Sequence, residues 1–150
     1  MSADSGNSSL HEKLLEVVTG LWFDIDHHDG TSASGFFLPD GAVQFGERAF
    51  RGTAEIDALY AARAGRGPRV SRHVVTNLHV TGVGPGTASA ISIVTLFAED
   101  GEPPRPAVTP AMVGDVNDVF EQREGRWLIR SRRIEQLFLA PETVIAVPFK

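Results

Sequence analysis

The stretch RHVVTNLHVTGVGPGTASAISIVTLF, residues 72–97, decides the fold of this chain. Apolar and polar residues alternate on both sides of the turn at 84–86, and both sides are rich in Val, Ile and Thr, which favours two strands joined as a hairpin. The same pattern returns further on, with a Glu124-Gly125 turn in its middle. We therefore predict an antiparallel meander of four long strands, at 72–83, 87–98, 112–123 and 127–139.

The first element upstream of these strands is predicted to be an amphipathic helix from Leu10 to His28. Apolar residues recur there at three- and four-residue spacing, and Ser9 with Glu12 forms a capping box at its start. Residues 1–9 are small and polar, lack the apolar stretch of a signal peptide, and are expected to be a disordered lead-in. Residues 10–139 then form a single domain, and residues 140–150 form a C-terminal tail.

Shorter elements are expected between that helix and the long strands. They are a short helix at 32–38, a turn at Pro39-Asp40-Gly41, a hairpin from 42–45 and 50–52, and a helix at 54–64 that Thr53 caps. Helices that precede an antiparallel meander predict an α+β architecture. We expect the N-terminal helices to pack on a strongly curved antiparallel sheet that encloses an apolar pocket, a common place for small molecules to bind.

Composition narrows the classes of function. The 150 residues are 42% hydrophobic and carry a formal net charge of -5, which argues against nucleic acid as a partner because phosphate binding needs a concentrated basic surface. No run of about 18 apolar residues is present, so no membrane span is expected. The chain has no cysteine, which excludes disulfides, thiolate chemistry and cysteine-bound zinc and is compatible with the cytoplasmic location that we expect.

Several short motifs, in a fixed order along the chain, resemble those of one known family. They are WFDIDHHD at 22–29, FFLPDGAV at 36–43, FRGTAEI at 50–56, RHVVTN at 72–77, and DVFE at 118–121 with GRWLI at 125–129. On these motifs residues 10–139 resemble the SnoaL-like branch of the nuclear-transport-factor-2-like superfamily, which includes scytalone dehydratase, bile-acid dehydratase and polyketide cyclases. The resemblance implies a cystatin-like cone with a ligand pocket.

The resemblance also implies an acid–base site made by Asp26 and His73. In the dehydratases of this family an aspartate on the first helix orients a strand histidine, which moves a proton at the substrate, and Asp26 and His73 occupy the matching positions. A carboxylate bonded to one ring nitrogen fixes the tautomer and leaves the other nitrogen to take a proton next to a carbonyl. The implied reaction is dehydration, isomerisation or cyclisation of a hydrophobic, oxygenated polyketide- or steroid-like molecule, without metal or cofactor.

Four further residues are candidates for contact with that ligand. Trp22 lies on the same helix face as the aspartate, as a core residue or a pocket wall. Val75 and Asn77 share the strand face of the histidine if no bulge intervenes. Asp118 either reaches the cavity or forms a salt bridge with a residue such as Arg132.

Two charged clusters are expected to have no role in the site. Adjacent residues on a helix diverge by about 100°, so the Asp and His residues at 24–29 cannot all converge on one ion, and no metal is expected. The arginines at 63, 66, 69 and 72 are expected to form a solvated surface or a subunit contact.

The sequence departs from scytalone dehydratase in two places. The strand at 87–98 holds no second histidine, and Ile25 stands where that enzyme has a tyrosine. Two alternatives to an enzyme therefore stay open: a non-catalytic ligand-binding or protein-interaction domain, and the small subunit of a ring-hydroxylating oxygenase.

A homodimer through the outer face of the sheet is expected, because a large exposed apolar face favours association. Candidate residues for that face are Phe97, Phe120, Phe138 and Leu139.

Overall fold

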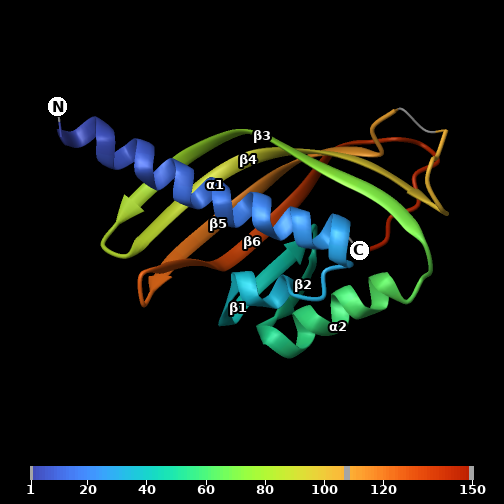
Figure 1. The fold of residues 1–150 in the computed structure, drawn as a ribbon, viewed down its shortest axis with the longest axis horizontal. Helices are drawn as coiled ribbons and strands as arrows, with labels where there is room; N and C mark the ends of the chain where they lie inside the picture. Colours follow the sequence, from blue (N-terminus) through green and yellow to red (C-terminus); the bar gives the residue numbers. More distant parts are fainter. Residues whose placement is uncertain (1, 107–108, 149–150) are drawn as a thin grey trace.

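Two helices and a six-stranded sheet make up the fold (Figure 1). The computed structural model describes residues 2–106 and 109–148. In chain order the elements are α1 (Ser2–His28), the 3-10 helix η1 (Ala33–Phe36), β1 (Phe37–Phe45), β2 (Arg48–Arg51), α2 (Gly52–Ala64), β3 (Arg69–Gly84), β4 (Thr87–Asp100), β5 (Met112–Arg123) and β6 (Arg126–Leu139). The predicted α+β class is confirmed, and all four predicted long strands are present.

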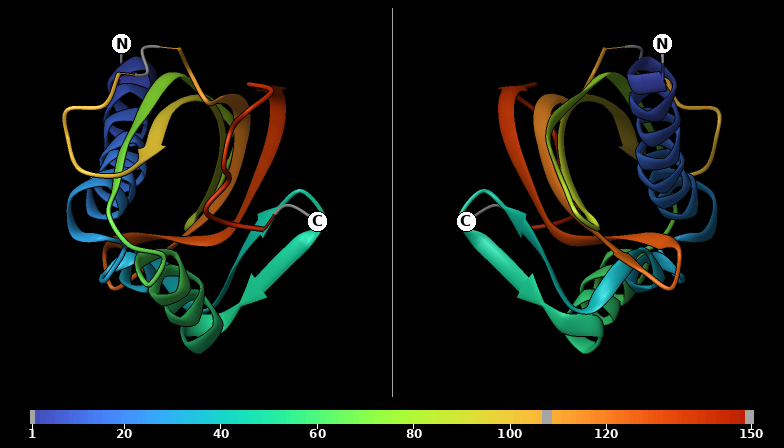
Figure 2. Two further views of the ribbon diagram at one scale, coloured as in Figure 1. Left: turned by 90° about the vertical axis from the view of Figure 1, so that its right-hand side faces the viewer. Right: turned by 90° about the vertical axis from the view of Figure 1, so that its left-hand side faces the viewer.

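The strands form a single open sheet in the order β2-β1-β6-β5-β4-β3. Strands β3 to β6 are the predicted antiparallel meander, but β1 runs parallel to β6. The sheet is therefore mixed rather than wholly antiparallel, because the hairpin of β1 and β2 attaches to the free edge of β6. Figure 2 shows β3 to β6 curving into an arc, with α1 beside β3 and α2 below the arc.

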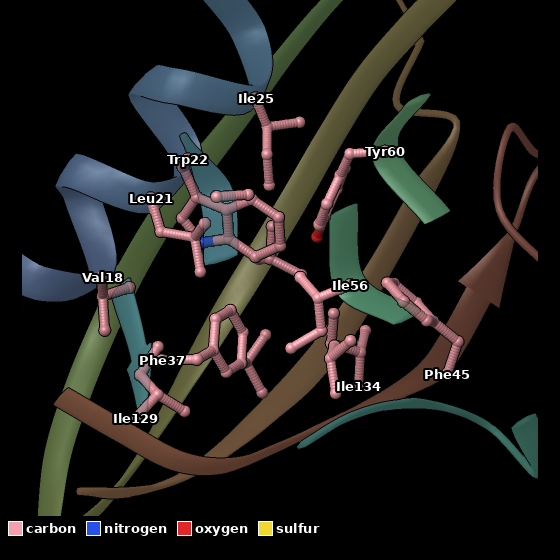
Figure 3. Packing of buried hydrophobic residues seen from close by; sticks show 14 of the residues in the cluster. Val18, Leu21, Trp22, Ile25, Phe37, Phe45, Ile56, Tyr60, Ile129 and Ile134 are labelled. Carbon is pink, nitrogen blue, oxygen red and sulfur yellow. The ribbon is translucent and has the colours of Figure 1, made fainter. Parts of the chain in front are cut away.

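The core fills the concave side of this arc. From Ala88 to Leu96, every second residue of β4 points inward and is buried, which is the alternation that the sequence predicts. The apolar stripe of α1 packs against this face, and α2 adds Ile56 and Tyr60 from the other side, as Figure 3 shows. The buried residues of the α1 stripe are Leu14, Val18, Leu21, Trp22 and Ile25. Each such side chain contributes about 1.5–3 kcal/mol by leaving water.

Both helices begin earlier than their cap patterns predict. Helix α1 starts at Ser2, so residues 2–9 are helical, and Ser9 lies within the helix and does not cap its start. No proline precedes Ser9 to stop the helix. Helix α2 starts at Gly52, ahead of the predicted cap at Thr53. The carboxylate of Glu55 instead accepts the backbone N–H of Arg51 at 2.6 Å.

Strand β1 includes the segment for which the sequence predicts a helix end and a turn. The predicted helix at 32–38 is reduced to η1, and Pro39-Asp40-Gly41 falls inside β1, where the register against β6 shifts. A Cβ on Gly41 would lie 2.8 Å from the carbonyl oxygen of Ile129. Glycine therefore allows the two backbones to approach at a point where a side chain would not fit.

A β-bulge interrupts β3 at Asn77. Between Thr76 and His79, three steps along β3 match two steps along β4, and Asn77 adopts a φ of 53°. The extra residue reverses the alternation that follows it. Leu78 and Val80 are therefore partly buried, while Asn77 and His79 are exposed.

The outer face of the sheet carries a row of residues from four neighbouring strands. Val74 pairs with Thr95, Thr95 with Val113, and Val113 with Phe138, which is 70% exposed. The prediction that Phe120 lies on this face is wrong, because the alternation of β5 turns it inward and buries it fully.

In the described part of the chain, neither helix is long and apolar enough to cross a membrane.

Candidate active site

The carboxylate of Asp26 and the ring of His73 form a hydrogen-bonded pair between α1 and β3. Oδ1 of Asp26 lies 2.7 Å from Nδ1 of His73 and accepts the hydroxyl of Ser71 at 2.8 Å. Oδ2 accepts the backbone N–H of His73 at 2.7 Å. The two side chains are 5% and 11% exposed. The residues that the family motifs single out are thus brought together, with the carboxylate held by three donors.

Burial and hydrogen bonding set the protonation of this pair. Desolvation lowers the pKa of His73 below its ordinary 6.5, against the hydrogen bond and charge of Asp26, and the nearby charges of Arg63 and Arg132 lower it further. Desolvation raises the pKa of Asp26, but the hydrogen bond and charge of His73 outweigh it and hold that pKa below 3.8. At neutral pH the imidazole is therefore neutral and the carboxylate ionised. Because a carboxylate only accepts, Nδ1 carries the ring proton and Nε2 keeps its lone pair.

Trp22 fixes the plane of the imidazole. Its ring stacks on His73 with the centroids 4.2 Å apart and the planes 6° from parallel. The guanidinium carbon of Arg132 lies 4.7 Å from the centroid of the same indole, a cation–π contact. Of the two roles considered for Trp22, the structure shows a wall of the pocket that also belongs to the core.

Asp118 is bound to Arg132 and does not line the pocket. Nε and Nη2 of Arg132 donate to the two carboxylate oxygens at 2.8 and 2.9 Å, and the two side chains are 1% and 2% exposed. This bidentate ion pair is the alternative to a cavity role that the sequence leaves open for Asp118. Nη1 of Arg132 and Nε1 of Trp22 are buried without a partner among the described residues.

A small pocket with about 50 Å³ of free space lies beside His73. Its wall is mostly apolar, and the residues that supply it are Trp22, Ile25, Phe45, Leu96, Met112 and Ile134. Its polar residues are Tyr60, Arg63, Arg69, Ser71 and His73. The C-terminal tail returns to this site, where Ile145, Ala146 and Val147 complete the lining. The C-terminal tail of the chain therefore forms part of the pocket wall.

Two residues of α2, Tyr60 and Arg63, belong to the site although the sequence does not predict it. Ile56, Tyr60 and Arg63 are four and three residues apart, so they share the inner face of the helix. The prediction of a solvated surface is wrong for Arg63, which is 8% exposed and whose Nη2 donates to Oγ of Ser71 at 3.0 Å. Desolvation raises the pKa of Tyr60 to about 12, so its hydroxyl stays protonated at neutral pH.

Like Asp118, the predicted ligand contacts Val75 and Asn77 lie outside the pocket. Val75 is half-buried against the core, and the bulge turns Asn77 out to solvent, so the expected shared face with His73 ends before Asn77. Among the residues that the structure describes, no three His, Asp or Glu side chains group as a metal site. Within the 24–29 cluster, Asp24 accepts the backbone N–H of Ser32 at 3.1 Å.

Solved bacterial structures share this architecture. A candidate scytalone dehydratase from Novosphingobium aromaticivorans aligns with a TM-score of 0.79 at 16% identity, covering 97% of this chain and 95% of that one. ActVI-ORFA from Streptomyces coelicolor aligns with a TM-score of 0.71 at 19% identity, covering 86% and 98%. A protein of unknown function with a cystatin-like fold from Nostoc punctiforme aligns at 0.70 and 22%, covering 87% and 90%. At these identities the likeness establishes the fold.

No curated protein sequence matches the chain. A family model, however, identifies the family as well as the fold. A family model described as a SnoaL-like domain matches residues 8–133, which include Asp26, His73 and the two pocket residues of α2. The family resemblance of the sequence motifs is confirmed, and the chain belongs to the SnoaL-like domain family.

Proposed function

We propose that the chain is a cofactor-independent enzyme that moves a proton on a hydrophobic, oxygenated molecule of the polyketide or steroid type. The observation that carries the proposal is the Asp26–His73 pair, in which the carboxylate lies 2.7 Å from Nδ1 while the ring lines an apolar pocket. Nε2 has no hydrogen-bond partner among the described residues. A buried base with one nitrogen oriented and the other open is the arrangement that general base catalysis requires.

The pocket residues can supply each proton that such a reaction moves. Nε2 of His73 would remove a proton from the carbon next to a ketone, and the negative charge of Asp26 would stabilise the imidazolium that forms. The protonated hydroxyl of Tyr60 would donate a hydrogen bond to the enolate oxygen. The imidazolium would return its proton to a β-hydroxyl, which leaves as water, or to another carbon, which gives an isomer.

The free volume of the pocket is small for the proposed substrate. About 50 Å³ of free space is far below the roughly 300–1,000 Å³ of typical ligand sites. A larger ligand would need the lining to move, and Ile145, Ala146 and Val147 are the part of that lining that lies outside the helices and strands. The apolar wall and the names of two structural neighbours, a candidate scytalone dehydratase and ActVI-ORFA, favour a fused-ring aromatic or polyketide substrate.

Hydrogen–deuterium exchange tests the proton-transfer step without knowledge of the natural substrate. The protein is incubated in D2O with 3-hydroxy-1-tetralone, a bicyclic β-hydroxy ketone, and deuterium at C2 and loss of water are followed by NMR. Both should exceed the buffer rate and fall about a hundredfold or more in His73→Gln, as expected for loss of a general base. His79→Gln, an exposed histidine on the same strand, is the matched control. Equal rates in both variants would refute the assignment.

A non-catalytic binding domain is the second candidate, and the small free volume of the pocket favours it, because so little space leaves no room for a reacting substrate without rearrangement. Saturable binding of the tetralone without exchange or dehydration would support this candidate over the enzyme. The small subunit of a ring-hydroxylating oxygenase is the third candidate, and co-purification of a large partner chain would support it.

We also propose a homodimer through the outer face of the sheet. The row from Val74 to Phe138 is apolar in three of its four positions, and Phe97 lies beside it at 36% exposure. Burial of such a row against a second copy removes apolar area from water. Light scattering at micromolar concentration should give twice the chain mass, and Phe138→Glu should give the monomer.

A further inference from the structure

Two guanidinium groups face the pocket from neighbouring elements. Arg63 lies in the last turn of α2 and Arg69 is the first residue of β3, so the short connection between them brings both side chains to the same wall. Among the described residues that line this pocket, the ionisable side chains other than Tyr60 are basic, and none is an aspartate or glutamate. The pocket is thus apolar with a positively charged side.

Arg63 is buried and has no carboxylate in direct contact among the residues that the structure describes. Its Nη2 donates to the hydroxyl of Ser71, and only through that hydroxyl does it reach the carboxylate of Asp26. Burial lowers the pKa of Arg63, and the charge of Arg69 is the next cause of that shift, so the two cations are close enough to repel each other. The charges of Asp26 and Asp29 raise that pKa in turn, and an anion in direct contact would compensate the buried guanidinium further.

In the described part of the chain, Arg69 pairs with the carboxylate of Asp100 and shares it with Arg66. Its Nη1 donates to Asp100 at 2.7 Å, while Arg66 reaches the other oxygen of the same carboxylate at 3.4 Å. Nη2 of Arg69 donates to the carbonyl oxygen of Val144 at 3.0 Å. The carboxylate of Asp100 thus serves both Arg66 and Arg69 at this edge of the pocket, and Nη2 of Arg69 donates to a neutral tail carbonyl.

We propose that Arg63 and Arg69 form a carboxylate-binding subsite, and that the ligand of this pocket is a hydrophobic organic acid. The ligand carboxylate binds between the two guanidinium groups and replaces the carbonyl of Val144, while its apolar body takes the space that Ile145 and Val147 fill. A carboxylate matches guanidinium geometry and balances the unpaired charge. This inference rests on the proposed function, because it names the substrate class of the same pocket.

Binding of two probes of one shape and different charge tests the subsite. Isothermal titration calorimetry compares 2-naphthoate with its neutral amide, 2-naphthamide, on the full chain. Wild type should bind the acid at least about tenfold more tightly, the effect of roughly one charge-assisted hydrogen bond. Arg63→Met and Arg69→Met should each remove most of that preference, and Arg63→Lys should keep part of it. Arg105→Met is the control, since Arg105 pairs with Glu99 and lies outside the pocket lining.

Three results would overturn the subsite: equal affinity for the acid and the amide, a preference that survives in both methionine variants, or no saturation by 2-naphthoate up to about 10 mM. If Arg63→Met does not fold, Arg69→Met and Arg63→Lys decide the question. His73→Gln should retain the preference for the acid. An acid preference without proton exchange would therefore refute the enzyme and leave the subsite standing, whereas exchange without acid preference would refute the subsite alone.

Discussion

Replacement of Asp26 by asparagine should reverse the tautomer of His73. In the native pair, Oδ2 of Asp26 accepts the backbone N–H of His73, and Oδ1 accepts Nδ1–H and the Ser71 hydroxyl. A backbone N–H can only donate, so the single oxygen of the introduced amide must turn toward it. The amide NH2 then faces Nδ1, which must become an acceptor. The ring proton therefore moves to Nε2, and the nitrogen that faces the pocket is no longer a base.

The size of the effect follows from the bonds that change. Charge-assisted hydrogen bonds contribute about 1.5–3 kcal/mol each, roughly twice a neutral bond, and the carboxylate accepts three donors. The introduced amide keeps the hydrogen bond from the backbone N–H of His73 and replaces the charge-assisted bonds with weaker neutral ones. We therefore expect the free energy of unfolding to fall by roughly 2 kcal/mol. For a chain of this length that lowers the melting temperature by about 4–8 °C. Proton exchange at the probe ketone should fall about a hundredfold or more.

Nitrogen-15 NMR of the histidine ring measures the tautomer directly. Protein labelled in its five histidines is compared as wild type and Asp26→Asn, with His73→Gln to assign the signals. Asp57→Asn, an exposed aspartate on α2, is the control for loss of a negative charge and should leave the His73 tautomer and the melting temperature unchanged. A His73 ring that keeps its proton on Nδ1 in Asp26→Asn would refute the reasoning.

Three further predictions concern stability. Because the pKa of His73 is lowered in the folded state, its contribution to the free energy of unfolding is full above pH 6.5 and is lost as pH falls through the folded pKa. The lowered pKa of Asp26 adds a second loss of stability below pH 3.8. Melting temperatures measured from pH 7.5 to 3 should show both losses, and His73→Gln should remove the first. Arg132→Met leaves Asp118 buried without its partner and should cost about 3–5 kcal/mol in urea unfolding, whereas the double change with Asp118→Leu should cost clearly less than the single one. Gly41→Ala should destabilise the chain by about 1–3 kcal/mol through the clash with the β6 backbone, and a neutral result in the same assay would contradict the account of the bulge in β1.

The elements with strong periodicity could be predicted from the sequence, and the site followed from motifs on those elements. The alternation in β3 to β6 and the apolar stripe of α1 placed His73 and Trp22 on inner faces, where the structure has them. The pairing of β1 with β6 could not be predicted, because the two strands are distant in the sequence and no local pattern records which edge a short hairpin joins.

The errors within the site have local causes. One extra residue in β3 turns Asn77 outward, and an asparagine in the left-handed region leaves no mark in the alternation before it. The charge of Arg63 favours a surface position, although its spacing from Ile56 and Tyr60 puts it on the inner face of α2. The position of Val147 in the pocket depends on contacts of the tail that composition does not encode.

The parallel stack of Trp22 on His73 makes the chain its own spectroscopic reporter. An excited indole transfers an electron readily to a protonated imidazole and poorly to a neutral one, so emission from Trp22 dims when the ring gains a proton. The other tryptophan, Trp127, lies more exposed at the start of β6, so its emission should lie further to the red. The blue edge of the emission spectrum therefore follows the ionisation of His73 without labels, and it would also register a molecule that displaces the tail beside this stack.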